Sequence, residues 1–176
     1  MFRRDPLENP EPLIQRVGAY VAYRIGEGAE AEDVTSEVFE RALRYRKTYD
    51  ASRGEPIAWL IGIARHCIND ALRGRQAATS DVPEAADPTD VEEEAVRRLS
   101  LAREVRRLDP GDRELLALRY GADLTARQIG ELLDMKKHAV EVAVQRALER
   151  LRARMKAQDE RPATASVRRR FRDEPA

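Results

Sequence analysis

Aromatic rings and cations alternate in one short stretch of the chain. The segment RYRKTYDASR, residues 44–53, contains Tyr45, Arg46, Lys47, Tyr49 and Arg53. Rings stack on unpaired bases while cations follow phosphates, and each stacked base contributes about 1–3 kcal/mol. The composition therefore favours binding of single-stranded nucleic acid, although both tyrosines could equally pack on a helical bundle.

A second candidate site is the segment LTARQIGELLDMKKHAVEVAVQRALERLRARM, from Leu124 to Met155. Its apolar residues recur at helical spacing, which predicts helices over 125–134 and 137–156 joined by a tight turn near Asp134–Lys136. Thr125 is a good N-cap for the first helix. Such a pair is typical of a helix-turn-helix that lays its second helix in the major groove of DNA. Plain helical hairpins share the pattern, so duplex DNA is a hypothesis at this point.

The outward face of the second helix carries the residues expected to touch duplex DNA: Lys136, Lys137, His138, Val142, Gln145, Arg146 and Arg150. Gln145 could pair with adenine, and Val142 could contact a thymine methyl group. The cations suit phosphates, which position a protein without specifying a sequence. Glu141 would instead repel phosphate or accept a hydrogen bond from cytosine.

An acidic stripe lies in AEDVTSEVFERAL, residues 31–43. Its members fall at spacings of three and four on one side of the predicted helix: Asp33, Ser36, Glu37 and Glu40. Such a stripe is usually a solvated helix face. The alternative is a docking surface for a basic partner.

The segment PIAWLIGIARHCINDALR, residues 56–73, is apolar around most of a helix. Such a helix belongs at the centre of a bundle, and we expect Trp59 and Cys67 to lie in the core. Arg65, Asn69 and Arg73 form one polar stripe at four-residue spacing.

Charge is balanced overall but segregated along the chain. There are 32 basic and 32 acidic side chains, yet residues 77–96 carry seven acids and no base. Residues 97–157 carry 15 basic and 9 acidic side chains, a net charge of +6. The predicted helix-turn-helix therefore lies in the basic part of the chain, as DNA binding requires.

Several classes of function are disfavoured. Cys67 is the only cysteine, so no internal disulfide can form, and a reducing cytoplasm is the expected location. His66 and His138 lie in different blocks, so no metal site is expected. No phosphate loop, nucleophile elbow or triad spacing occurs, so we expect neither a cofactor nor enzymatic activity. No apolar run approaches the roughly 20 residues of a membrane helix, so no membrane insertion is expected.

Helix-forming residues dominate, and nine prolines and nine glycines are few, which predicts an all-α protein. We expect two small helical domains joined by a flexible acidic linker over residues 77–96. An N-terminal helical bundle would fill residues 1–76, with helices over 11–25, 30–47 and 55–74. The last block, about 91–157, would form four helices over 91–107, 110–121, 125–134 and 137–156. The helix-turn-helix domain itself is assigned to 97–157. A disordered tail is expected over 158–176.

Three motifs in this order resemble bacterial extracytoplasmic-function (ECF) sigma factors. They are AEDVTSEVFERAL (31–43), YDASRGEPIAWLIGIARHCINDALR (49–73) and the helix-turn-helix. The W-L-x-x-I-A-R run from Trp59 to Arg65 and the x-x-R-A-L-x-R-L run ending at Leu151 match together. The resemblance covers nearly everything from Leu13 to Met155, and the combination is far more specific than any single motif.

The resemblance implies a sigma factor that binds core RNA polymerase and directs initiation at specific promoters. The acidic stripe Asp33, Ser36, Glu37 and Glu40 would dock on the coiled coil of the polymerase β′ subunit. The loop residues Tyr45, Arg46, Lys47, Tyr49 and Arg53 would capture a base flipped from the minus-ten element, with Arg65 and Asn69 beside the strand. The last domain would contact the β flap and read the minus-thirty-five element as duplex. The resemblance also implies an anti-sigma partner and a factor that is monomeric when free.

The turn of the helix-turn-helix departs from the family pattern. Asp134 and Lys136 stand where Gly and Ser are common, and losing the Ser cap costs about 1 kcal/mol. Asp tolerates the left-handed conformation that the turn needs. Two alternatives stay open: a helix-turn-helix regulator that does not join the polymerase, and a sigma-like module that only binds an anti-sigma factor.

Overall fold

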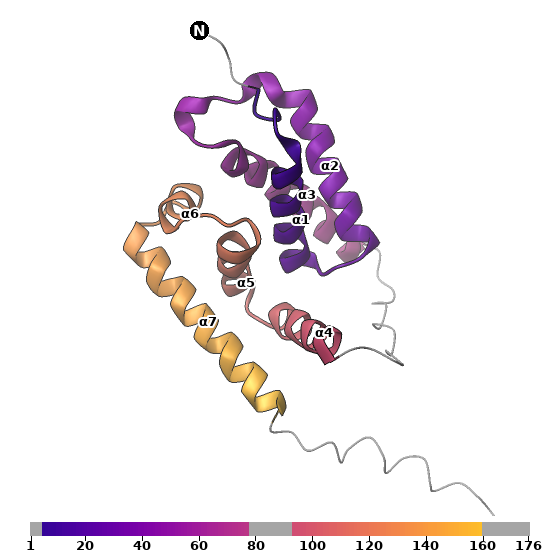
Figure 1. Ribbon diagram of the computed structural model, residues 1–176, viewed down its shortest axis with the longest axis vertical. Helices are drawn as coiled ribbons and strands as arrows, with labels where there is room; N and C mark the ends of the chain where they lie inside the picture. Colours follow the sequence, from indigo (N-terminus) through magenta and orange to yellow (C-terminus); the bar gives the residue numbers. More distant parts are fainter. Residues whose placement is uncertain (1–4, 78–92, 160–176) are drawn as a thin grey trace, which may run out of the picture.

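The computed structural model describes residues 5–77 and 93–159, and every regular element in them is helical (Figure 1). The N-terminal block contains α1 (Pro10–Ile25), α2 (Ala29–Tyr45), the short turns η1 (Arg46–Thr48) and η2 (Ala51–Arg53), and α3 (Pro56–Ala77). The C-terminal block contains α4 (Glu93–Arg106), α5 (Pro110–Leu116), the π-helical turn η3 (Ala117–Gly121), α6 (Ala126–Leu133) and α7 (Lys137–Asp159). The all-α prediction is confirmed. Most of the predicted linker and tail lies outside the described residues.

The N-terminal block is built around α3. Its apolar side chains Leu60, Ile61 and Ile68 are fully buried and pack between α1 and α2. Cys67 is also buried there, as predicted, and burial raises the pKa of its thiol. The polar stripe of α3 is left outside this core, which places Asn69 at the surface.

The prediction of one α-helix over 110–121 is wrong. The α-helix ends at Leu116, and residues 117–121 widen into a π-helical turn in which the Ala122 N–H donates to the Ala117 carbonyl at 2.9 Å. Local helix propensity does not distinguish these two windings, and π turns are rare in helices. The widened turn presents Gly121 to α1, so its cause is tertiary.

Other helix ends differ by only a few residues. The central helix runs to Ala77 rather than residue 74, and the last helix runs to Asp159 rather than residue 156. The predicted helix over 30–47 ends its α-helical part at Tyr45, after which η1 tightens the chain. Helix ends fray and tighten in ways that sequence patterns do not fix.

The helix-turn-helix is formed as predicted. Thr125 caps α6 in a capping box with Gln128, and Asp134 takes the left-handed conformation at φ 55° and ψ 47°. The turn is tight, because a Cβ added to Gly130 would lie 2.4 Å from the Met135 carbonyl oxygen. Only glycine allows the two helices to meet this closely.

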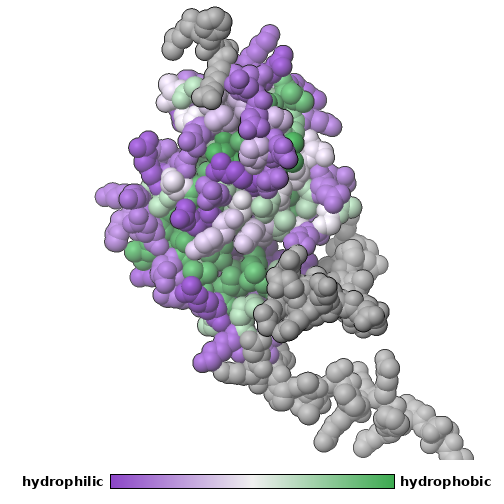
Figure 2. All heavy atoms as spheres, in the orientation of Figure 1, coloured by the Kyte–Doolittle hydropathy of each residue, from purple (hydrophilic) through white to green (hydrophobic). Residues whose placement is uncertain are grey.

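The two blocks pack against each other through α1, which lies along η3, α4 and α5 (Figure 1). Buried residues of both blocks form one hydrophobic cluster. The face seen in Figure 2 is largely hydrophilic, with hydrophobic side chains showing between the helices of the C-terminal block. The sequence had predicted two helical domains but not this close packing between them.

Candidate nucleic-acid interface

The loop between α2 and α3 gathers the five aromatic and basic residues predicted to hold a single strand. Tyr45 is 50% exposed at the end of α2, and the three cations beside it, Arg46, Lys47 and Arg53, are exposed. Tyr49 is placed differently, since its ring centroid lies 5.6 Å from that of Trp59 and its hydroxyl donates to the Gly54 carbonyl at 2.9 Å. Tyr45 is therefore the open ring of this loop, and Tyr49 holds the loop to α3.

Asp50 stiffens the same loop. Its carboxylate accepts a hydrogen bond from the Ser52 backbone N–H at 3.0 Å and another from the Ser52 hydroxyl at 2.7 Å. This side-chain cap fixes the start of η2 and so the position of Arg53. Sequence reasoning had not given Asp50 a role, although Asp before Ser is a familiar turn signal.

Arg65 is not free to meet a strand in this structure. Its Nε lies 3.3 Å from Oε1 of Glu114 in α5, and its Nη1 donates to the Leu132 carbonyl of α6 at 3.4 Å. Asn69, one turn further along α3, is exposed. Of the two residues predicted to flank the strand, Arg65 is therefore already paired with the C-terminal block, whereas Asn69 is open to solvent.

A cavity of about 330 Å³ lies between this loop and α6. One wall is made by Tyr49 and Trp59, and the opposite wall by Gln128 and Leu132. Gln128 also donates a hydrogen bond to the Glu55 carboxylate at 3.1 Å. The half-buried aromatic wall thus faces the first helix of the helix-turn-helix across this cavity.

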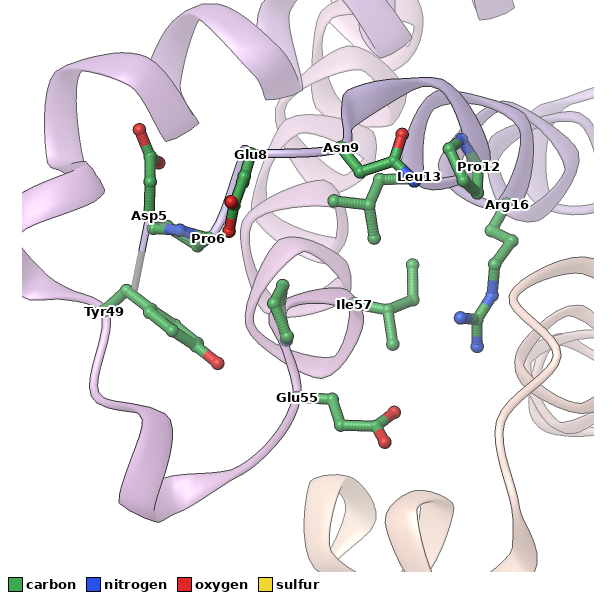
Figure 3. Close-up of a pocket in the computed structure, with 11 residues that line it drawn as sticks. Asp5, Pro6, Glu8, Asn9, Pro12, Leu13, Arg16, Tyr49, Glu55 and Ile57 are labelled. Carbon is green, nitrogen blue, oxygen red and sulfur yellow. The ribbon is translucent and has the colours of Figure 1, made fainter. Parts of the chain in front are cut away.

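A larger cavity of about 500 Å³ lies on another side of the loop, between it and the start of α1 (Figure 3). Three carboxylates line it: Asp5, Glu8 and Glu55. Its one arginine, Arg16, donates to the carbonyls of Ala122 and Asp123 at 2.8 and 2.9 Å. The acidic lining would repel phosphate, so this cavity does not suit a nucleic-acid backbone.

The acidic face of α2 is open to solvent. Asp33, Ser36 and Glu40 are exposed. Glu37 is half-buried and accepts from Nη2 of Arg41 at 2.5 Å, and the same nitrogen lies 3.2 Å from Asp70. Glu37 therefore contributes to the bundle as well as to the face.

Sequence reasoning missed one residue of this face. Leu43 follows Ser36 and Glu40 at helical spacing, and it is 56% exposed. A single exposed apolar side chain is ordinary at a protein surface, so Leu43 extends this face without identifying its partner. The signal was present in the sequence, since Leu43 continues the spacing of the stripe.

The predicted duplex-binding face of α7 is mostly exposed. Solvent reaches Lys136, Lys137, His138, Gln145 and Arg146, whereas Val142 is half-buried. Gln145 donates to Glu149 at 3.0 Å, and Lys137 lies 3.5 Å from Glu141. These are exposed pairs, which contribute little to stability.

Arg150 is held more firmly than the other cations of α7. Its Nη1 donates to both carboxylate oxygens of Asp112 in α5, at 2.7 and 2.8 Å. Asp112 is nearly buried, so this pair joins α7 to α5. The prediction that Arg150 contacts phosphate now competes with a structural role that the sequence did not reveal.

Two other findings concern the kinds of site and segment that the described residues can form. In residues 5–77 and 93–159, no cluster of three or more His, Cys, Asp or Glu side chains is arranged to hold a metal ion. Within the same ranges, no helix has the length and apolar character needed to span a membrane.

Comparison with known proteins identifies the two blocks. The sigma-70 region 2 family matches residues 11–78, and the sigma-70 region 4 family matches residues 83–151. The chain is 34% identical to the ECF RNA polymerase sigma factor SigD of Mycobacterium tuberculosis over 164 residues, covering 85% of this chain and 74% of SigD. It is 31% identical over 150 residues to the ECF RNA polymerase sigma factor BldN of Streptomyces coelicolor, covering 81% of this chain but only 56% of BldN.

Two solved structures share the fold. One is the sigma factor RpoE in complex with the anti-sigma factor NepR from Bartonella quintana, with a TM-score of 0.68, 16% identity, and 83% of this chain and 93% of that chain covered. The other is CnrH in complex with the cytosolic domain of CnrY, with a TM-score of 0.59, 22% identity, and 87% and 93% of the two chains covered. With its sigma-70 regions 2 and 4 and its relatives, the chain belongs to the ECF sigma factor family of transcription initiation factors.

Proposed function

We propose that this chain binds core RNA polymerase and directs it to a specific class of promoters. The observation that carries the proposal is that one chain of this family has three exposed surfaces that differ in charge and in side-chain type. They are an exposed acidic face on α2, an aromatic and basic loop after it, and an exposed helix-turn-helix face on α7.

Each surface takes the partner that its chemistry suits. The α2 face, with Asp33, Ser36, Glu37 and Glu40, docks on the coiled coil of the β′ subunit through opposite charge, with Leu43 at its edge. The loop from Tyr45 to Arg53 takes unpaired bases of the minus-ten strand, because every base offers a face for stacking. Region 4 contacts the β flap and places α7 in the major groove of the minus-thirty-five duplex.

The base contacts of α7 follow from its side chains. Gln145 pairs with adenine through its amide, and Val142 contacts thymine methyl groups. Lys136, Lys137 and Arg146 neutralise phosphates, which makes binding strongly dependent on salt. His138 lies at the exposed start of the helix and reaches the edge of the groove.

The wider setting follows from this role. The factor carries out no chemistry of its own and works in the cytoplasm, where polymerase and chromosome meet. The two solved structures of similar fold hold their sigma factors with NepR and CnrY. An anti-sigma factor is therefore a partner that we propose for this chain too.

The test is reconstitution of transcription from purified parts. The full chain is mixed with core polymerase and a library of promoter fragments, and transcripts are sequenced. The proposal expects transcripts that start downstream of one shared pair of elements and are absent with polymerase alone. Duplex binding without polymerase association would support the regulator instead, and binding to neither would exclude both functions.

A further inference from the structure

The cavity between the start of α1 and the strand-binding loop (residues 45–55) has an apolar floor (Figure 3). Leu13 and Ile57 point toward one another inside it, and Leu13 is half-buried whereas Ile57 is buried. Three prolines complete the apolar lining: Pro6, Pro12 and Pro56. The volume of about 500 Å³ lies in the range of pockets that bury a small molecule, about 300–1,000 Å³, so the cavity can take one large side chain.

The rim of the same cavity is acidic, since Asp5, Glu8 and Glu55 line it. Asp5 accepts a hydrogen bond from the backbone N–H of Leu7 at 3.0 Å, and Glu55 accepts one from the Gln128 amide at 3.1 Å. Both of these donors are uncharged, and the guanidinium of the lining arginine is directed to backbone carbonyls. The rim therefore attracts a cation.

The segment that leads into the cavity has the complementary chemistry. Residues 1–4 lie outside the described residues and join the cavity at Asp5, which is part of its lining. Phe2 precedes Asp5 by three residues, and three residues of extended chain span about 10 Å, enough to cross a cavity of this volume. The segment offers one large apolar ring, Phe2, and two guanidinium groups, Arg3 and Arg4.

We infer that residues 1–4 dock in this cavity, with the Phe2 ring on the apolar floor and the two arginines on the acidic rim. Because the segment is tethered at the rim, contacts too weak to hold a separate peptide are enough to hold it. All residues that line the cavity belong to the N-terminal block, so the docking site does not depend on the helices of the C-terminal block.

The docked segment braces the strand-binding loop from the side of α1. Tyr49 lines this cavity and also the cavity in front of Trp59, so its ring is supported on two sides once the segment is in place. A loop that is held in position loses less conformational entropy when a base binds, which raises its affinity for the strand. This bracing role rests on the proposed function, whereas the docking itself does not.

Fluorine NMR of the full chain tests the docking. The chain contains three phenylalanines, Phe2, Phe39 and Phe171, and uniform replacement by para-fluorophenylalanine gives each of them a signal. Phe2→Leu and Phe171→Leu assign the signals. The inference expects the Phe2 signal to move little when H2O is replaced by D2O, because a docked ring is shielded from solvent. A Phe2 signal that moves as much as it does in the urea-unfolded chain would overturn the docking.

Two leucine variants test where the ring docks. Leu13→Ala should shift the Phe2 signal and increase its response to D2O, because part of the floor is removed. Leu148→Ala removes a half-buried leucine of α7 and is the matched control, which should leave the Phe2 signal unchanged. Circular dichroism shows that both variants stay helical. Equal effects of the two variants would overturn the contact with the floor, and a response of Phe171 in place of Phe2 would assign the cavity to the other arginine-rich segment.

Binding to a forked promoter fragment tests the bracing. The complex of the full chain with core polymerase is titrated with a fragment that presents the minus-ten element as a single strand. Phe2→Ala should weaken this binding about threefold because the loop is less well held, and Phe171→Ala, which removes the other phenylalanine among arginines, should not.

The outcomes separate the inference from the proposed function. Unchanged binding by Phe2→Ala would overturn the bracing. A Phe2 signal that becomes shielded only after the single strand is added would make Phe2 a strand contact and overturn the docking. Absence of promoter binding by the unmutated complex would contradict the proposed function and the bracing with it, while the fluorine signals still decide the docking.

Discussion

The strand-binding loop and the recognition helix differ in how available they are. On α7, Lys137 and Gln145 are exposed and pair with neighbours on the same helix, whereas Arg150, Arg154 and Gln158 bond to other parts of the chain. Beside the loop, Arg65 is already paired with Glu114 and the Leu132 carbonyl of region 4, although Tyr45 stays exposed. The difference teaches that cations with similar predicted roles divide into those open to solvent and those already paired within the chain.

The largest expected effect concerns the open face of α2. Charge reversal at Asp33 and Glu37 to Lys should weaken association with core polymerase about a thousandfold, because like charges facing each other cost several kcal/mol. Titration of labelled chain with core polymerase measures it. Reversal of Glu11 and Glu27, two exposed acids outside the face, is the control and should change little. Unchanged association in the first variant would remove α2 from the interface.

The next effect concerns the buried polar cluster around Glu114, between the two blocks. Glu114→Ala should lower the free energy of unfolding by about 3 kcal/mol, because it leaves Arg24 and the Tyr20 hydroxyl buried without their acceptor. Glu131→Ala, which removes an exposed pair with Arg127, should cost less than about 1 kcal/mol. Urea denaturation of both variants gives the comparison. Similar losses would mean that the buried cluster contributes no more than a surface pair.

A smaller effect distinguishes two arginines of α7. Arg146 has no hydrogen bond or ion pair to another described residue, whereas Arg150 is held by Asp112. Arg146→Ala should lower duplex affinity and reduce the slope of log affinity against log salt by about 0.9, the value for one phosphate contact. Arg150→Ala should change the slope less and the stability more. Fluorescence anisotropy with a promoter duplex at several salt concentrations measures both, and an unchanged slope for Arg146→Ala would place it away from phosphate.

The smallest effect is a dependence on alkaline pH. Burial raises the pKa of Tyr20 above its ordinary value of 10.0, with Arg24 and Arg65 opposing the shift. The unfolded chain therefore loses this proton first, so stability is complete below pH 10 and falls as pH rises through the folded pKa. The free energy of unfolding should therefore be lower at pH 11 than at pH 9. Tyr20→Phe should flatten this part of the stability curve, and an equally steep fall would exclude Tyr20 as its source.

Local patterns were sufficient for much of the fold. Thr125 and Asp134 predicted the two ends of α6. The apolar character of residues 56–73 predicted that α3 lies at the centre of the N-terminal bundle. These features depend on residues close in sequence, so spacing and capping rules apply directly. The same rules placed the aromatic and basic residues on one exposed loop.

Contacts between residues distant in sequence could not be predicted from these local patterns. Glu114 is one acid among many in the sequence, and only the packing of α1 against α5 buries it beside Arg24 and Arg65. The π-helical turn has the same origin, since Gly121 needs room against Tyr20. The partners of Arg65 and Arg150 were missed because charge alone does not tell a DNA contact from an ion pair.

Hydrogen–deuterium exchange of the full chain, alone and bound to core polymerase, tests the central claim most directly. The account predicts that backbone amides of 33–43, on the exposed face of α2, exchange more slowly in the complex than in the free chain. The core of α3 should stay protected in both states. Equal exchange of 33–43 in the free chain and in the complex would contradict docking of the α2 face on the polymerase.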